Sequence, residues 1–138
     1  MIFQHSIRNS TSTHGEMHDL TDKVQAVVKE SGVAAGIVNV SVVGSTASIS
    51  TIEFEPGLKR DLPELLDRLM PPSRGYGHEQ TWHDGNGHSH LQATLMGPSI
   101  MLPVREGKLA VGTWQQIFLI ENDIKPRQRE VIVTVCGE

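Results

Sequence analysis

A chain of 138 residues has room for one domain with a single core, but not for a second domain of ordinary size. Its formal net charge of −4, without any long basic stripe, argues against a nucleic-acid partner. A single cysteine, Cys136, excludes an intrachain disulfide and favours a reducing compartment. We therefore expect one domain over residues 1–138.

The first third of the chain predicts a strand and then a helix. Residues 2–8 alternate between apolar and polar side chains as a strand does, and the polar residues 9–19 are typical of a loop. Apolar residues then recur at helical spacing, which predicts a helix near residues 20–31. Gly32 is suited to end that helix.

Two strands are predicted next, over residues 36–44 and 45–55, joined as a pair through Gly44. Polar residues interrupt the first run, which is far shorter than the roughly 20 apolar residues that cross a bilayer. Residues 1–10 also lack the basic and then apolar pattern of a signal peptide. We expect a soluble cytoplasmic protein without a membrane partner.

The second half of the chain predicts one further helix and then mostly strands. Leucines mark a short helix near residues 62–69, with Asp61 as its cap and Pro63 in its first turn. Three or four strands joined by tight turns are expected within residues 99–104, 109–121 and 130–137. The predicted class is α+β: a single domain, mainly antiparallel β-sheet, with two or three helices packed on one side.

Histidines cluster between the predicted helix near residues 62–69 and the strands that start at residue 99. They lie in the segment "HDGNGHSHL" at residues 83–91 and at His78 upstream. A zinc ion needs imidazole nitrogens that converge on one point about 2 Å away. His88 and His90 point to the same side on a strand, whereas on a helix they lie about 200° apart. The cluster therefore indicates a metal or acid–base site if the backbone is extended or irregular there, and a solvated turn otherwise.

Other polar residues are candidates on weaker grounds. Gln115 and Gln116 follow Trp114 in a stretch that otherwise resembles a core strand, which suits either a site or an interface. Arg127 and Arg129 begin the last predicted strand, where they either clamp a phosphate or serve as ordinary strand-end charges. The sequence has no Walker loop, dinucleotide fingerprint, nucleophile elbow or CxxC pair.

Several stretches together resemble one known family. They are "YGHEQTWHDGNGHSHLQATLMGPS", "LPVREGKLAVGTWQQIFLIEND" and the closing "RQREVIVTVCGE", with "STASISTIEFEPGLKRDL" before them. The chain is identified on these motifs as similar to the YjbQ family, also called the secondary thiamine-phosphate synthase family. The resemblance implies a compact α+β fold, a homotrimer, and a histidine-bearing pocket at a subunit boundary that binds a divalent metal.

The resemblance also implies roles for particular residues. His78, His88 and His90 match the metal-binding histidines, and zinc is the expected ion, with magnesium as the alternative. Asn86 and Gln115, as catalytic candidates, and Arg129, for substrate binding, match the family's recurring polar positions, and His18, also for substrate binding, matches a histidine just before the first helix. Within the cluster, Asp84 or Glu79 would handle protons as a further catalytic candidate, and Arg127 beside Arg129 would also bind substrate. One departure is clear, because Gly44-Ser45-Thr46 stands where many members have His-Thr-Thr or His-Thr-Ser.

Two readings of function follow from the cluster and the resemblance. The first is a metal-assisted transferase that joins a pyrimidine diphosphate to a thiazole phosphate and releases pyrophosphate, with the activity main or incidental. The second is a trimeric protein that binds a metal or a small phosphorylated metabolite without turnover. A metal-dependent hydrolase of a small phosphorylated molecule and a purely structural histidine cluster are the further alternatives.

Overall fold

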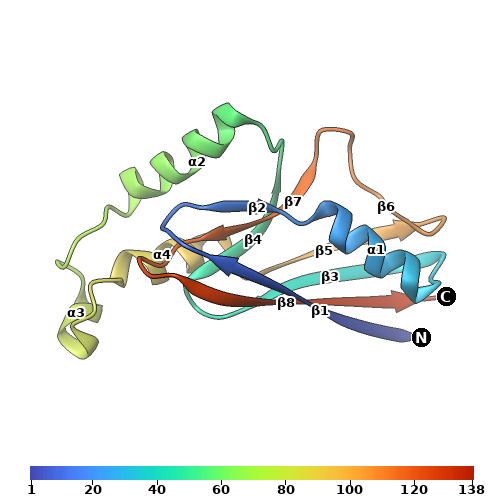
Figure 1. Cartoon of the computed structure of the whole chain (residues 1–138), viewed down its shortest axis with the longest axis horizontal. Helices are drawn as coiled ribbons and strands as arrows, with labels where there is room; N and C mark the ends of the chain where they lie inside the picture. Colours follow the sequence, from blue (N-terminus) through green and yellow to red (C-terminus); the bar gives the residue numbers. More distant parts are fainter.

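The computed structural model describes all residues, 1–138, as two antiparallel sheets with four helices (Figure 1). The helices are α1 (Thr21–Ser31), α2 (Pro56–Leu69), α3 (Gly77–Trp82) and α4 (Gly87–Met96). The strands are β1 (Ile2–Thr11), β2 (Met17–Asp19), β3 (Ala35–Val43), β4 (Ala47–Ile52), β5 (Ser99–Arg105), β6 (Lys108–Leu109), β7 (Gln116–Glu121) and β8 (Arg127–Gly137). The predicted α+β class with mainly antiparallel sheet is confirmed.

The larger sheet has five strands in the order β1-β8-β3-β5-β6, and the smaller sheet has three in the order β2-β7-β4. The main core is formed by alternate valines of β3 and β8, by the first turns of α1 and by one face of β7. The opposite face of β7 packs under α2, where Phe118 and Ile120 meet Leu66. Burial on both faces explains why residues 117–120 are an unbroken apolar run.

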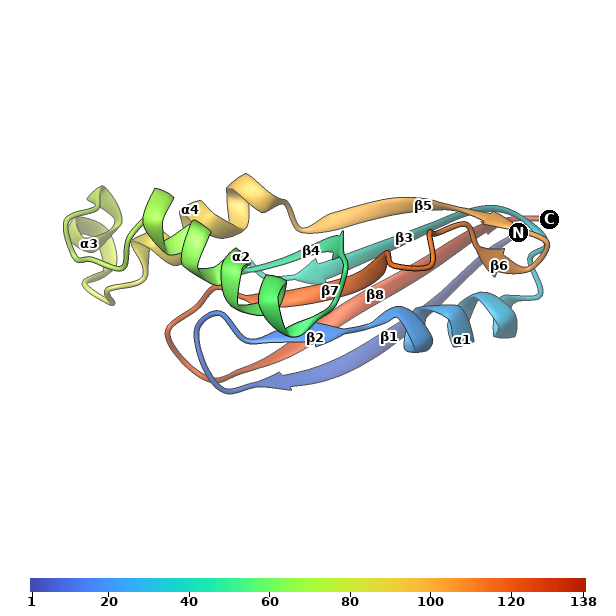
Figure 2. The ribbon, with the colours of Figure 1, turned by 90° about the horizontal axis from the view of Figure 1, so that it is seen from above.

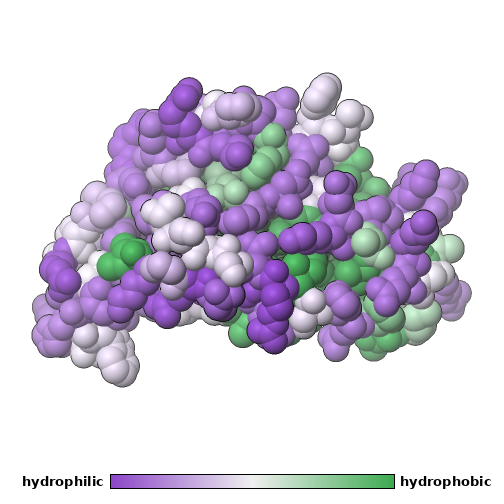
Figure 3. Space-filling view, in the orientation of Figure 1, coloured by the Kyte–Doolittle hydropathy of each residue, from purple (hydrophilic) through white to green (hydrophobic).

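The helices are distributed unevenly along this elongated body (Figure 2). Both termini lie at one end, whereas α3 and α4 lie at the opposite end, beside the turn from β7 to β8. None of the four helices is both long and apolar enough to cross a bilayer. On the face shown in Figure 3, hydrophilic residues cover most of the end that carries α3, and apolar residues gather nearer to α1.

Two predictions about the middle of the chain were wrong. Strands β3 and β4 do not pair with each other, because β3 lies between β5 and β8 while β4 pairs with β7. Gly44 therefore leads the chain from one sheet to the other. The helix expected to begin beside Asp61 begins at Pro56, since the Glu55 side chain accepts hydrogen bonds from the N–H groups of Gly57 and Leu58.

Other boundaries differ less. Helix α1 ends as predicted at Gly32, which has a φ of 73°. The predicted loop over residues 9–19 contains the end of β1 and the short strand β2. Strand β7 begins only at Gln116, so Trp114 and Gln115 lie in the turn before it.

Candidate functional site

A polar cavity of about 330 Å³ opens at the end of the molecule away from the termini. It lies where the β3–β4 connection, α3, α4, the β7–β8 turn and the start of β8 meet. Trp82 is its one apolar lining residue. The full lining is Gly44, Ser45, Thr46, His78, Trp82, Asp84, Asn86, His90, Asp123, Arg127 and Arg129.

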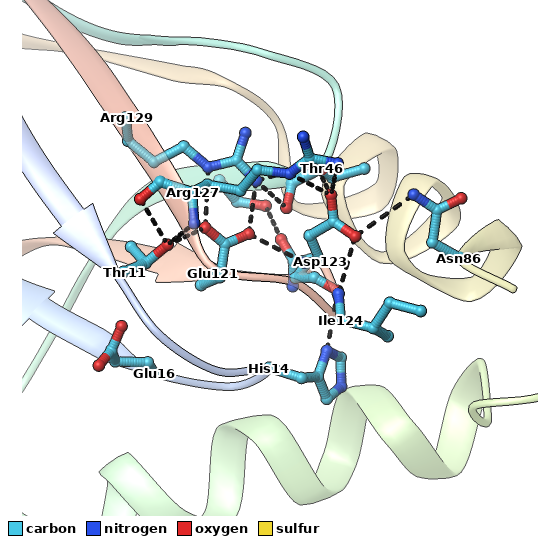
Figure 4. Close-up of polar contacts among 12 residues, drawn as sticks. Thr11, His14, Glu16, Thr46, Asn86, Glu121, Asp123, Ile124, Arg127 and Arg129 are labelled. Atoms are coloured by element: carbon cyan, nitrogen blue, oxygen red, sulfur yellow. Dashed lines mark hydrogen bonds and ion pairs between the residues drawn. The ribbon is translucent and has the colours of Figure 1, made fainter. Parts of the chain in front are cut away.

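The floor of this cavity rests on a buried ion pair between Arg129 and Glu121 (Figure 4). The arginine Nε and Nη2 donate to the two carboxylate oxygens at 2.8 and 2.5 Å, and Nη2 also donates to the carbonyl and hydroxyl oxygens of Thr46. Nη1 donates to no group of the chain, and a Cβ added to Gly44 would lie only 2.8 Å from it. The missing side chain at position 44 therefore leaves one end of the guanidinium uncovered.

Asp123 is the second buried acid of the floor, with 0% of its surface exposed. It accepts hydrogen bonds from Arg127, Thr46, Asn86 and the Ile124 N–H (Figure 4). Burial alone raises the pKa of Asp123, but these bonds outweigh it and hold the pKa below the ordinary value. The carboxylate thus stays charged and fixes Arg127, whose Nη2 lies 2.7 Å from it.

Two imidazoles form one wall. His78 near the start of α3 and His90 on α4 have ring centroids 4.4 Å apart, with ring planes at 51°. The two helices approach closely because position 87 is a glycine, where a Cβ would lie 2.8 Å from Tyr76 Cβ. Burial, and then the neighbouring His78, lower the pKa of His90, which keeps that ring neutral near pH 7. A neutral imidazole is the form that binds metals.

Asp84 completes a pair of potential metal ligands with His78. Asp84 Oδ1 lies 3.4 Å from His78 Nε2, and both atoms are buried without a hydrogen-bond partner. Two ligand atoms that each lie about 2.0–2.1 Å from a tetrahedral zinc ion are separated by about 3.4 Å. The pair therefore fits a divalent ion, although no three His, Cys, Asp or Glu side chains converge on one point. The His90 ring is the nearest further imidazole of this wall.

Comparison with known proteins places the chain in a family. A family model described as UPF0047 protein YjbQ-like matches residues 5–138. The chain belongs to this YjbQ-like family. A UPF0047 protein of Archaeoglobus fulgidus is 41% identical over 89% of this chain and 93% of its own length. One from Methanothermobacter thermautotrophicus is 37% identical over 99% of this chain and 94% of its own length.

Solved structures agree with this assignment. A YbjQ-like protein of unknown function from Sulfolobus solfataricus P2 superposes with a TM-score of 0.89 at 38% identity, with all of both chains covered. A hypothetical protein from Aeropyrum pernix K1 gives a TM-score of 0.86 at 33% identity, over 97% of this chain and 99% of its own. The resemblance to the YjbQ family is thus confirmed over nearly the whole length.

In this YjbQ-like protein, six of the residues singled out in the sequence line the cavity together. They are His78, Asp84, Asn86, His90, Arg127 and Arg129. His88 does not join them, because it lies two residues before His90 on a regular helix and faces the other side. It is 1% exposed and packs against His14, with ring centroids 5.3 Å apart. The structure thus does not bring the three expected metal-binding histidines to one point.

Three further candidates lie outside the cavity. The Glu79 carboxylate pairs with Arg74 and accepts a hydrogen bond from the Gly85 N–H at 2.9 Å, so it holds the loop between α3 and α4. Gln115 stands at the opposite end of β7 from the cavity, where it bonds the turn at Gly112. His18 lies on β2, 3.3 Å from Glu16.

Three residues that position the two arginines were not among the candidate site residues: Thr46, Glu121 and Asp123. Thr46 had entered only as part of the run that departs from the family pattern. The two acids belong to the run "END" at the end of an apolar strand, which resembles an ordinary polar turn. The signal was present nonetheless, because two acids there face two arginines in "RQR" across a short connection. The two strands belong to different sheets, but the short connection between them brings the opposite charges within reach.

Proposed function

We propose that this YjbQ-like protein is a metal-assisted enzyme that acts on a phosphorylated small molecule in the polar cavity. In its specific form, the proposal is a transferase that joins a pyrimidine diphosphate to a thiazole phosphate. One juxtaposition carries the proposal: the unpartnered His78–Asp84 pair and the uncovered Nη1 of Arg129 line the same cavity. A metal ligand pair beside a free guanidinium edge is suited to phosphate oxygens.

The metal would be held by His78 Nε2 and Asp84 Oδ1, with His90 beside them. Zinc suits two imidazoles and one carboxylate, and magnesium is the alternative. A bound divalent ion would supply Lewis acidity that stabilises the charge on a departing diphosphate. Since the ligand atoms are buried and unpaired in the chain, the ion would also satisfy polar groups that otherwise lose hydrogen bonds.

The chain's own residues hold the phosphate. Arg129 offers Nη1, and its buried pairing with Glu121 fixes the direction of that group. Arg127 is half exposed and is oriented by Asp123. Charged donors held in advance stabilise developing negative charge without having to reorganise.

The transfer step itself asks for no general base. The ring nitrogen of a thiazole carries no proton, so its lone pair forms the new carbon–nitrogen bond directly. The carbon–oxygen bond to the diphosphate breaks, and pyrophosphate leaves with that electron pair. Asp84, expected from the sequence to handle protons, is then free to act as a ligand, and Asn86 in the same lining serves to fix Asp123.

The proposal includes a cytoplasmic homotrimer. The outward face of the larger sheet supports self-association, because neither the smaller sheet nor any helix covers it. Ile37 and Met101 on that face are 42% and 61% exposed. Uncovered apolar side chains of this kind are typical of subunit contacts.

A second candidate function is favoured by the charge balance of the floor. Arg127 and Arg129 already face Asp123 and Glu121, so the cavity offers fewer free donors than a dedicated diphosphate cradle. That balance suits a ligand with a single phosphate, either hydrolysed with the help of the metal or bound without turnover. The transferase would release pyrophosphate, the hydrolase would release inorganic phosphate, and the binding protein would release no product.

One experiment separates the readings. The purified protein, loaded with zinc or with magnesium, is given the pyrimidine diphosphate with and without the thiazole phosphate. We expect pyrophosphate and thiamine phosphate to appear only when both substrates are present, and D84N to abolish both. Release of inorganic phosphate from one substrate alone would instead support the hydrolase. Saturable binding without any product would support the binding protein.

A further inference from the structure

The polar cavity has a single apolar element, the indole of Trp82. The side chain is one of only six aromatic residues counted as Phe, Trp or Tyr in the whole chain, and it is 69% exposed. An indole left in water forgoes the stabilisation that burial of its large apolar face would bring. Its place at the mouth of a site, rather than in the core, therefore calls for an explanation.

The position of Trp82 is fixed by the helix that carries it. Trp82 is the last residue of α3, four residues after His78, so both project from the same side of the helix. The segment is anchored by the ion pair of Arg74 with Glu79, and Glu79 also accepts the Gly85 N–H. The indole is thus presented by a braced wall of the cavity, beside the metal ligand pair.

The charged donors of the lining come from another element, the start of β8. Arg127 and Arg129 define where a phosphate is held, and Trp82 belongs to the wall formed by α3. A ligand with a phosphate at one end and a flat ring at the other matches both features. An aromatic face stacks on planar rings of many kinds, because every such ring has a π-face.

We propose that Trp82 is the stacking platform for the planar ring of the phosphate ester that the cavity binds. This inference rests on the proposed phosphate-binding function and deepens it by assigning the residue that recognises the ring. Trp82 is the specificity-determining residue of the site in this view, whereas the arginines recognise only the phosphate.

The chain supplies a matched control. Trp114 is 72% exposed, nearly the same as Trp82, but it lies in the turn before β7 and does not line the cavity. Exposed tryptophans are also common where subunits meet. Comparison of the two tryptophans therefore separates a ligand platform from a general contact role.

The test uses two probes that share a ribose phosphate and differ at C1: uridine 5′-monophosphate carries a uracil ring there, and ribose 5-phosphate carries a hydroxyl. Calorimetry on the full-length protein measures their affinities for the wild type, W82A, W82F and W114A. We expect the wild type to favour the uridine compound, and W82A to weaken its binding about tenfold, in line with the loss of one stacked base. W82A should leave ribose 5-phosphate unaffected, W82F should retain most of the preference, and W114A should change neither affinity.

A second readout comes from fluorescence of W114F, in which Trp82 is the sole tryptophan. Uridine 5′-monophosphate should quench it, and ribose 5-phosphate should not. Equal wild-type affinity for the two probes, or equal weakening of both by W82A, would overturn the platform while leaving phosphate binding intact. A changed mass in solution for W82A, with unchanged affinities, would assign Trp82 to a subunit contact. If the wild type binds neither probe, the proposed function falls together with this inference.

Discussion

His88 and His90 lie two residues apart on α4, and their rings occupy opposite sides of that helix. The His90 ring centroid is 4.4 Å from that of His78 in the cavity wall, whereas His88 packs 5.3 Å from His14 in the interior. Burial lowers the pKa of His88, and both of its ring nitrogens lack a partner in the chain. Only one histidine of the pair can therefore share an ion with His78.

Zinc binding should depend on the wall of the cavity and not on the buried imidazole. We expect H78A and D84N each to weaken zinc affinity by at least about tenfold, because H78A removes a ligand atom and D84N replaces the charged carboxylate with a neutral amide. H88Q should bind zinc as the wild type does. Isothermal titration with zinc at pH 7 measures all three, and H83N, at an exposed position with a φ of 57°, controls for loss of a nearby histidine.

An equal loss of zinc affinity in H88Q and H78A would contradict this assignment. It would mean that α4 rearranges so that both faces contribute to one ion. The comparison is sharp because His88 is closer to Asp84 in the sequence than His78 is, yet only His78 lines the cavity.

The sequence could locate the site but could not sort its histidines. The cluster of imidazoles around residues 83–91 predicted a polar centre, and six of the residues singled out do line one cavity. Whether His88 belongs to it depends on whether residues 87–96 are helical. The segment "HLQATLM" contains good helix formers, but the two glycines before it left an irregular backbone open.

Contacts that form only in the folded chain explain the other differences. Glu121 and Asp123 resemble surface charges in the sequence. Burial of a carboxylate is costly in free energy, and here the ion pairs with Arg129 and Arg127 offset that cost. The step from β3 to β4 resembled a hairpin, because a glycine between two β-rich runs gives no local sign that the chain changes sheets. Strand pairings distant in sequence decided the second case, whereas the acid–arginine pairs lie only four and eight residues apart and depend on how the β7–β8 turn folds.

The buried ion pair beneath the cavity should matter greatly for stability. R129M leaves the Glu121 carboxylate buried without its partner, so the free energy of unfolding should fall by about 3–5 kcal/mol. Urea denaturation followed by circular dichroism measures the change. As a control, R8M removes the exposed pair of Arg8 with Glu130, whose atoms are 3.6 Å apart, and should cost less than about 1 kcal/mol. Similar losses in both variants would contradict the argument.

Asp123 should make stability depend on pH in the acid range. Its pKa in the folded chain is below the ordinary value of 3.8, so the unfolded chain takes up a proton first as the pH falls. The stabilisation that the charged Asp123 carboxylate contributes is therefore complete from about one pH unit above 3.8 upward. It is lost as the pH falls through the pKa of Asp123 in the folded chain. We expect the stability difference between the wild type and D123N to be constant near neutral pH and to narrow below about pH 4.

Measuring both chains by urea denaturation at several pH values isolates this residue, because every other carboxyl is common to the two. A difference that stays constant down to the acid limit of folding would show that Asp123 keeps an ordinary pKa. A difference that widens toward acid would show that the pKa is raised, with burial outweighing the four hydrogen-bond donors.

The close approach of α3 and α4 should fail when Gly87 gains a side chain. A Cβ at that position would lie 2.8 Å from Tyr76 Cβ and 3.3 Å from His78 Cβ, which forces the start of α3 away from α4. We expect G87A to lower the free energy of unfolding by about 1–3 kcal/mol and to weaken zinc binding, since His78 would move with α3.

G77A is the matched control: it also changes the first residue of a helix, but nothing lies within 4 Å of its added Cβ. Because alanine favours helices more than glycine does, G77A should be neutral or slightly stabilising and should bind zinc normally. Unchanged zinc affinity in G87A would mean that the spacing of the two helices does not position the ligand pair.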